Sequence, residues 1–127
     1  MGRCRHGFDP RRVLVVEDES IIASLTVEML TDEGYEVRSA GDGCSALGLL
    51  QAWTPCLILL DIMMPVMDGR AFLREVWQLE ELADTRVVLV SGAGGPMLSG
   101  VSMRVADVLR KPFNFDRLLD TVERLAT

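Results

Sequence analysis

Apolar residues gather along this chain in short unbroken runs, which is the pattern of strands buried on both faces of a sheet. The three clearest runs lie within 12–16, 57–60 and 87–90. A further strand is predicted over 105–110. The segment 35–40 alternates polar and apolar residues, so it is predicted to form a strand near an edge of the sheet.

Between these strands the apolar residues recur at spacings of three and four, which predicts amphipathic helices. The first helix is predicted over 20–33, where Gly34 ends it. Its apolar stripe consists of Ile21, Ile22, Leu25, Met29 and Leu30. Three more helices are predicted, each of which begins after a capping residue: Asp42 (to about 53), Asp68 and Asn114.

The glycine-rich segment 92–104 predicts only a short, poorly formed helix or a mobile loop. Elsewhere strands and helices alternate along a chain of 127 residues, the length of one domain. Regular alternation implies parallel strands joined by right-handed crossovers. The predicted fold is therefore an α/β sandwich of three layers around a five-stranded parallel sheet. The segment 1–11 is predicted to be a mobile basic tail, and 12–127 the folded domain.

Four of the five predicted strands end in polar residues. They are Glu17 and Asp18 after the first strand, Asp61 after the third, Ser91 after the fourth and Lys111 after the fifth. The carboxyl ends of parallel strands form one rim, where ligands bind in open α/β sheets. Taken singly, the two aspartates can be explained as caps, the serine as a turn residue and the lysine as solvated. Their joint position at one rim favours a shared functional site.

The residue types at this rim predict a magnesium site next to a phosphoryl group. Carboxylates that lie close together repel one another unless a cation is present, and Mg²⁺ prefers carboxylate, water and phosphate oxygens. No His or Cys accompanies the acids, so zinc is not expected. A carboxylate can also attack phosphorus and form an acyl phosphate, provided that cations and a donor stabilise the phosphoryl oxygens. Lys111 and Ser91 offer such a cation and a hydroxyl donor.

Four motifs in order, VLVVEDE, LLDIMMPVMDG, VVLVSG and LRKPF, resemble those of the receiver domains of two-component response regulators. The resemblance covers residues 12–126, and it is to the chemotaxis-regulator type. It implies a doubly wound, flavodoxin-like sheet with the strand order 2-1-3-4-5. It also implies that one aspartate is phosphorylated, and that a sensor histidine kinase or a histidine phosphotransfer protein supplies the phosphoryl group.

Position by position, the resemblance implies that Asp61 is the phospho-acceptor. The implied ligands of Mg²⁺ (or Mn²⁺) are Glu17, Asp18, Asp61 and the backbone carbonyl of Met63. Ser91 and Lys111 are implied to bind the phosphoryl group.

Two departures from the family pattern concern the switch. The family usually carries an aromatic residue three positions before the lysine, where this chain has Val108. The glycine-rich stretch before it is short, so the fourth helix is expected to be reduced. We therefore hypothesise that order in residues 92–105, rather than an aromatic rotamer, is the bistable element.

Charge and composition narrow the expected partners. The net charge of −6 divides into +3 for residues 1–12 and −9 for the remainder. An acidic body argues against binding of nucleic acid, and no apolar run approaches the roughly 18 residues of a membrane span. The cysteines Cys4, Cys44 and Cys56 lack metal-ligand spacing and fit a reducing cytoplasm. A kinase or phosphotransfer protein and a downstream protein target are expected partners, and a homodimer stays open.

Three alternatives compete with the phosphoryl-accepting function. A pseudo-receiver would bind partners without phosphorylation, although no acid, hydroxyl or lysine position is lost here. A phosphohydrolase would need a second acid two residues after Asp61, where Met63 stands, so no enzymatic activity beyond self-phosphorylation and self-dephosphorylation is expected. A flavin protein would need a phosphate-binding loop where this chain has EDES.

Since no output domain follows the last helix, we expect a stand-alone receiver or one excised from a larger regulator or hybrid kinase.

Overall fold

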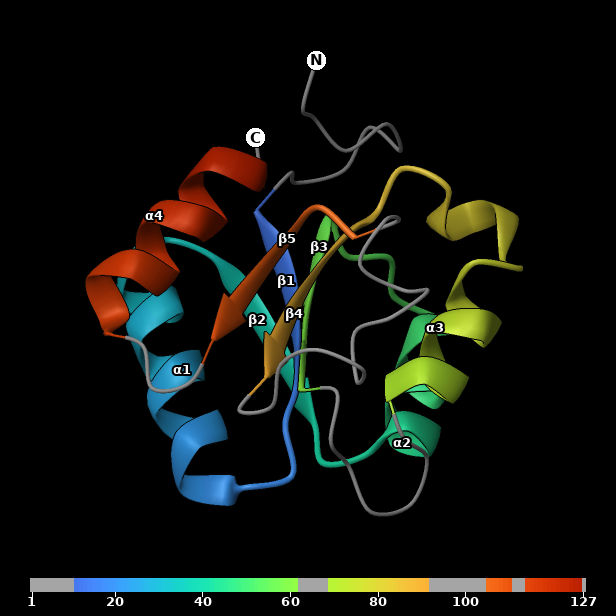
Figure 1. Ribbon diagram of the computed structural model, residues 1–127, viewed down its shortest axis with the longest axis horizontal. Coiled ribbons are helices and arrows are strands. Elements are labelled where there is room, and N and C mark those ends of the chain that lie inside the picture. Colours follow the sequence, from blue (N-terminus) through green and yellow to red (C-terminus); the bar gives the residue numbers. More distant parts are fainter. Residues whose placement is uncertain (1–10, 62–68, 92–104, 111–113, 127) are drawn as a thin grey trace.

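In the computed structural model, one parallel sheet of five strands lies between two layers of helices (Figure 1). The structure describes residues 11–61, 69–91, 105–110 and 114–126. In chain order the elements are β1 (Arg12–Val16), α1 (Ser20–Asp32), β2 (Glu36–Ala40), α2 (Gly43–Leu50), β3 (Leu57–Asp61), α3 (Gly69–Val76), the 3₁₀ turn η1 (Glu80–Leu82), β4 (Arg86–Ser91), β5 (Asp107–Arg110) and α4 (Phe115–Leu125).

The strand order is β2-β1-β3-β4-β5, and every neighbouring pair is parallel. This confirms the predicted α/β class and the order 2-1-3-4-5. The chain moves from β1 outward to β2 on one side and from β3 outward to β4 on the other. The helices that follow β1 and β3, α1 and α3, lie on opposite faces of the sheet, so the rim between these two strands is the place where ligands bind in open α/β sheets.

The unbroken apolar runs are explained by burial on both faces of the sheet. Successive strand residues point to opposite faces. One set packs in a core with α2 and α3: Leu14, Val16, Ile58, Leu60, Val87 and Leu89. The alternate set packs with α1 and α4: Val13, Val15, Leu57, Leu59, Val88 and Val90. In β2 only Ala40 is buried, so the predicted edge position is confirmed.

The predicted apolar stripe of α1 is wrong in part. Leu30 is buried, but Ile21 is 74% exposed and Leu25 is 46% exposed. Thr26 takes the buried position instead, at 5% exposure. A polar residue can occupy this position because its hydroxyl donates a hydrogen bond of 2.8 Å to the backbone carbonyl of Ile22, one turn earlier. The buried face of α1 is thus rotated away from the face with the most apolar residues.

The predicted ends of the helices are mostly confirmed. Gly34 has a φ of 100° and follows α1, as expected of a residue that ends a helix. Asp42 accepts a hydrogen bond of 2.8 Å from the Ser45 amide, and Asn114 caps α4 in the same way. Helix α2 ends at Leu50, earlier than predicted.

Some predictions lie outside the described residues. These are the segment 1–10 of the predicted tail, the cap at Asp68, and the reduced helix or loop over 92–104. Within the described part of the chain, no helix has both the length and the apolar character of a membrane span.

Candidate functional site

The candidate site lies where β1 and β3, the two central neighbours, reach the rim. Val16 is opposite Leu60 in the parallel register, so Glu17 and Asp18 leave β1 beside Asp61, the last residue of β3. The Glu17 amide donates a hydrogen bond of 3.0 Å to the Ala40 carbonyl, which fixes the end of β1 to the end of β2. The backbone therefore places all three acids before any side-chain interaction is considered.

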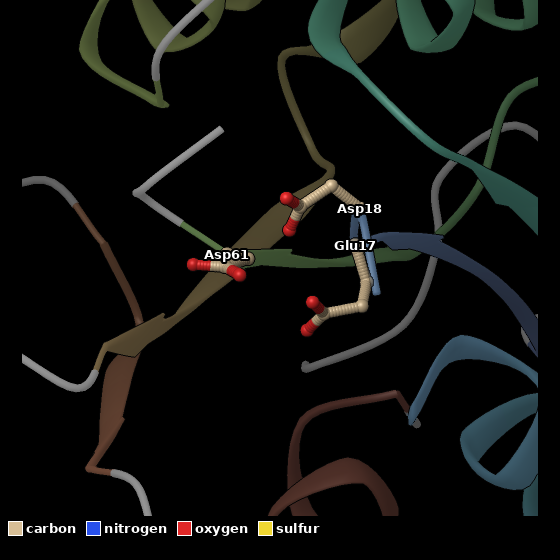
Figure 2. A group of neighbouring side chains, drawn as sticks. All are labelled: Glu17, Asp18 and Asp61. Carbon is tan, nitrogen blue, oxygen red and sulfur yellow. The ribbon is translucent and has the colours of Figure 1, made fainter. Parts of the chain in front are cut away.

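The carboxylates of Glu17, Asp18 and Asp61 surround one common space (Figure 2). One oxygen from each lies within 4.8 Å of the others. Among the residues that the structure describes, this is the one such group of three potential metal ligands. The sequence prediction that these acids meet at the rim is thus matched by the geometry.

Burial makes this arrangement costly without a cation. Glu17 is 6% exposed and Asp61 is 5% exposed, while Asp18 is exposed. Like charges in a poorly solvated place repel strongly, and buried charges normally need a partner or a metal. The donor set consists of hard oxygen atoms with one solvent-facing side, which fits Mg²⁺ with water or phosphate completing its coordination. The Glu19 amide donates a hydrogen bond of 3.2 Å to Glu17 and helps to fix that carboxylate.

The structure describes the other predicted site residues only in part. Ser91 ends β4, the neighbour of β3, so its backbone reaches the same rim. Met63 and Lys111 lie outside the described residues. Val108, at the position where an aromatic residue is usual, lies opposite Leu89 and packs against the core that contains α2 and α3.

Sequence reasoning missed two features near the acids. A groove of about 420 Å³ next to Glu17 and Asp18 runs between α1 and the end of β2, and Ser20, Ser24 and Ser39 line part of it. Buried Thr26 lines a second, smaller cavity beneath the acids. No pattern in the sequence marks these hydroxyl residues, because serine and threonine side chains ordinarily face solvent.

A model of the response regulator receiver domain family matches residues 13–123. The chain therefore belongs to this family, as the resemblance predicted. Receiver domains accept phosphoryl groups and are not enzymes in the ordinary sense.

Curated relatives differ in how much of their length this chain spans. The chemotaxis protein CheY of Bacillus subtilis is 29% identical over 116 residues, which are 89% of this chain and 95% of CheY. The nitrogen assimilation regulatory protein NtrX of Azorhizobium caulinodans is 36% identical over 88% of this chain, which is 25% of NtrX. The transcriptional regulatory protein PdtaR of Mycobacterium tuberculosis is 34% identical over 90% of this chain and 56% of PdtaR. The chain thus spans nearly all of CheY but little more than half of PdtaR.

Solved structures agree with the fold. The chemotaxis protein CheY4 of Vibrio cholerae gives a TM-score of 0.83 at 33% identity, over 90% of this chain and 97% of CheY4. The response regulator TrrA of Thermotoga maritima, solved in complex with Mg²⁺-BeF, gives a TM-score of 0.80 at 32% identity, over 91% of this chain and 98% of TrrA. These neighbours confirm the flavodoxin-like fold class.

Proposed function

We propose that this chain is the phosphoryl-accepting receiver domain of a two-component phosphorelay, which is phosphorylated on Asp61 in the presence of Mg²⁺. The observation that carries the proposal is the gathering of three carboxylates around one space at the rim, with Asp61 at the end of a fully buried strand. A cluster of that kind, in a member of the receiver family, fits a metal and a phosphoryl group better than it fits a structural role.

The reaction follows from the chemistry of the site. Glu17, Asp18 and Asp61 would hold Mg²⁺, which when bound neutralises charge on the phosphoryl oxygens. An oxygen of the Asp61 carboxylate attacks phosphorus, and the bond from phosphorus to the donor atom breaks, so an acyl phosphate forms on Asp61. The carbonyl of Met63 is proposed as a further metal ligand. Ser91 and Lys111 are proposed to donate to the phosphoryl oxygens and to balance their charge.

Helix α1 supports a protein as the phosphodonor, namely a histidine kinase or a phosphotransfer protein. Ile21 and Leu25 stand one turn apart on α1, and both are exposed although they are large and apolar. The helix begins two residues after Asp18, so a partner helix that covers this pair lies beside the acids. We propose that this pair is the phosphodonor contact. After transfer, the extra charge of roughly −1.5 to −2 at the rim changes the surface that a downstream protein binds.

The test is intact mass spectrometry after incubation with acetyl phosphate and Mg²⁺. We expect a gain of one phosphoryl group, about 80 Da, that requires Mg²⁺ and is absent from the Asp61→Asn variant. A gain that persists in Asp61→Asn would contradict the assignment of the acceptor. If neither acetyl phosphate nor a histidine kinase adds the group while Mg²⁺ still binds, the pseudo-receiver function is favoured instead.

A further inference from the structure

Most of the buried polar groups in the described part of the chain surround one small cavity. Glu17, Thr26, Asp61 and Thr121 are the buried polar or charged side chains among these residues. The first three line a cavity of about 20 Å³, whose other described walls are apolar side chains of β1, β3, β4, α1 and α4. Asp18 is not among the lining residues, so the cavity lies on the interior side of the acids.

The polar groups that line this cavity all accept hydrogen bonds. The Thr26 hydroxyl donates its proton to the Ile22 carbonyl, at 2.8 Å, so its oxygen has lone pairs left to accept with. The carboxylates of Glu17 and Asp61 are acceptors when ionised. A molecule that occupies the cavity must therefore supply protons.

The volume of the cavity limits what can occupy it. A cavity of roughly 10–15 Å³ is enough for one water molecule, provided that the water finds two or more polar partners. Here the volume is about 20 Å³, which admits one water molecule and no larger donor. The Glu17 carboxylate points toward the layer of α1 and α4, the layer that contains Thr26 (Figure 2).

We propose that this cavity holds one ordered water molecule, which donates hydrogen bonds to the Thr26 hydroxyl and to the Glu17 carboxylate. Thr26 then acts as a positioning residue, because the water that it fixes holds Glu17 in one orientation toward the metal site. The functional part rests on the proposed role of Glu17 in binding Mg²⁺. The water itself requires neither phosphorylation nor metal.

Helix α4 offers a matched control for Thr26. Thr121 is buried to 3% exposure, and its hydroxyl donates a hydrogen bond of 2.9 Å to the Arg117 carbonyl, also one turn earlier. It does not line the cavity. Thr121→Val therefore removes the same kind of hydroxyl from the same kind of helix position without touching the site.

The first measurement is a crystal structure of the metal-free protein at a resolution that shows ordered water. We expect water density between residues 17 and 26 in the natural chain and in Thr26→Ser, and none in Thr26→Val. An empty cavity in the natural chain, a metal ion in this place, or water that persists in Thr26→Val would each overturn the proposal.

The second measurement is Mg²⁺ affinity by titration calorimetry. Thr26→Val is expected to bind Mg²⁺ about three- to tenfold more weakly, the range for the loss of one hydrogen bond, while Thr26→Ser and Thr121→Val stay within about twofold of the natural chain. Equal affinities in Thr26→Val and Thr121→Val would reject the positioning role. If neither acetyl phosphate nor a histidine kinase modifies a protein that still shows both results, only the phosphoryl-accepting function is rejected.

Discussion

The two ends of the sheet carry charge in opposite ways. At the amino end, Glu36 lies 3.3 Å from Arg12 and accepts a hydrogen bond of 3.1 Å from the Trp53 indole. The guanidinium groups of Arg12 and Arg38 lie over the Trp53 ring, at 5.7 and 4.7 Å from its centroid. Each of these three charges has an opposite charge or an aromatic face within the chain.

At the carboxyl ends of β1 and β3, by contrast, three negative charges are gathered. Glu17, Asp18 and Asp61 place their oxygens within 4.8 Å of one another. Opposite charges and aromatic faces that meet within the chain contribute to folding, whereas like charges brought close together cost stability unless a cation lies among them. The comparison predicts that the amino end contributes mainly to stability and the carboxyl end to the proposed binding of Mg²⁺, so variants at the two ends should separate these properties.

The largest expected effect on stability is at the amino end. Trp53 is 4% exposed, so Trp53→Ala is expected to lower the free energy of unfolding by about 3–5 kcal/mol, as measured by urea denaturation. Trp77→Ala is the matched control and should cost less, because Trp77 is only partly buried. Mg²⁺ affinity of the folded protein should not change in either variant. A Trp53→Ala protein that folds but no longer binds Mg²⁺ would break the division between the two ends.

The next largest effect is a gain in stability, at the carboxyl end of the sheet. Without Mg²⁺, Asp61→Asn is expected to raise the free energy of unfolding by about 1–2 kcal/mol, because a neutral amide relieves the repulsion among the acids. Added Mg²⁺ should stabilise the natural chain and have much less effect on this variant, which thermal unfolding with and without the metal would show. As a control, Asp84→Asn neutralises an exposed acid in the turn after η1. It should change neither the metal-free stability nor the stabilisation by Mg²⁺. Loss of stability in metal-free Asp61→Asn would contradict the comparison.

A smaller effect on stability is expected on the exposed face of α1. The double variant Ile21→Ser and Leu25→Ser should change the free energy of unfolding by less than about 0.5 kcal/mol, because both side chains are exposed. Leu30→Ala on the same helix removes a buried side chain and should cost about 2–5 kcal/mol. Transfer from a histidine kinase should slow several-fold in the double variant, while modification by acetyl phosphate keeps its rate. An equal loss with both phosphodonors would argue against a protein contact at this pair.

The smallest effect is confined to alkaline pH. Burial, and then the charge of Glu123, raise the pKa of Tyr35 above its ordinary value of 10.0. The folded state thus holds the phenol proton more tightly than the unfolded state, so this contribution to stability is complete below pH 10 and is lost as the pH rises further. Tyr35→Phe should make the alkaline decline in stability less steep. Since Tyr35 is the single tyrosine of the chain, its ultraviolet titration measures the pKa directly, and a midpoint at or below 10.0 would contradict the shift.

The fold could be predicted because its strands are easily recognised as unbroken apolar runs. Strands buried on both faces must be apolar throughout, and a parallel sheet brings their ends to one rim whatever the side chains do. The convergence of Glu17, Asp18 and Asp61 follows from backbone topology alone, which explains why the sequence was enough to predict it.

Features that depend on rotation or on long side chains could not be predicted. The spacing of the apolar residues in α1 predicts that Ile21 and Leu25 face the core and gives no sign that Thr26 does, whereas Thr26 is the buried residue of the three. A threonine in a helix is expected at the surface, and only the structure shows that the Thr26 hydroxyl donates a hydrogen bond to a carbonyl of its own helix. The cluster around Trp53 joins residues from two strands and from the segment after α2, and no local pattern encodes such a meeting.

The separation of charge also governs how the domain meets other molecules. The three clustered acids give the carboxyl end of the sheet a locally negative field, whereas at the amino end the charges of Glu36, Arg12 and Arg38 largely offset one another. A partner with a basic surface turns such a molecule during diffusion, so that the acidic end arrives first. Before any contact forms, Asp61 is already directed toward the approaching surface, and salt in the medium weakens this alignment.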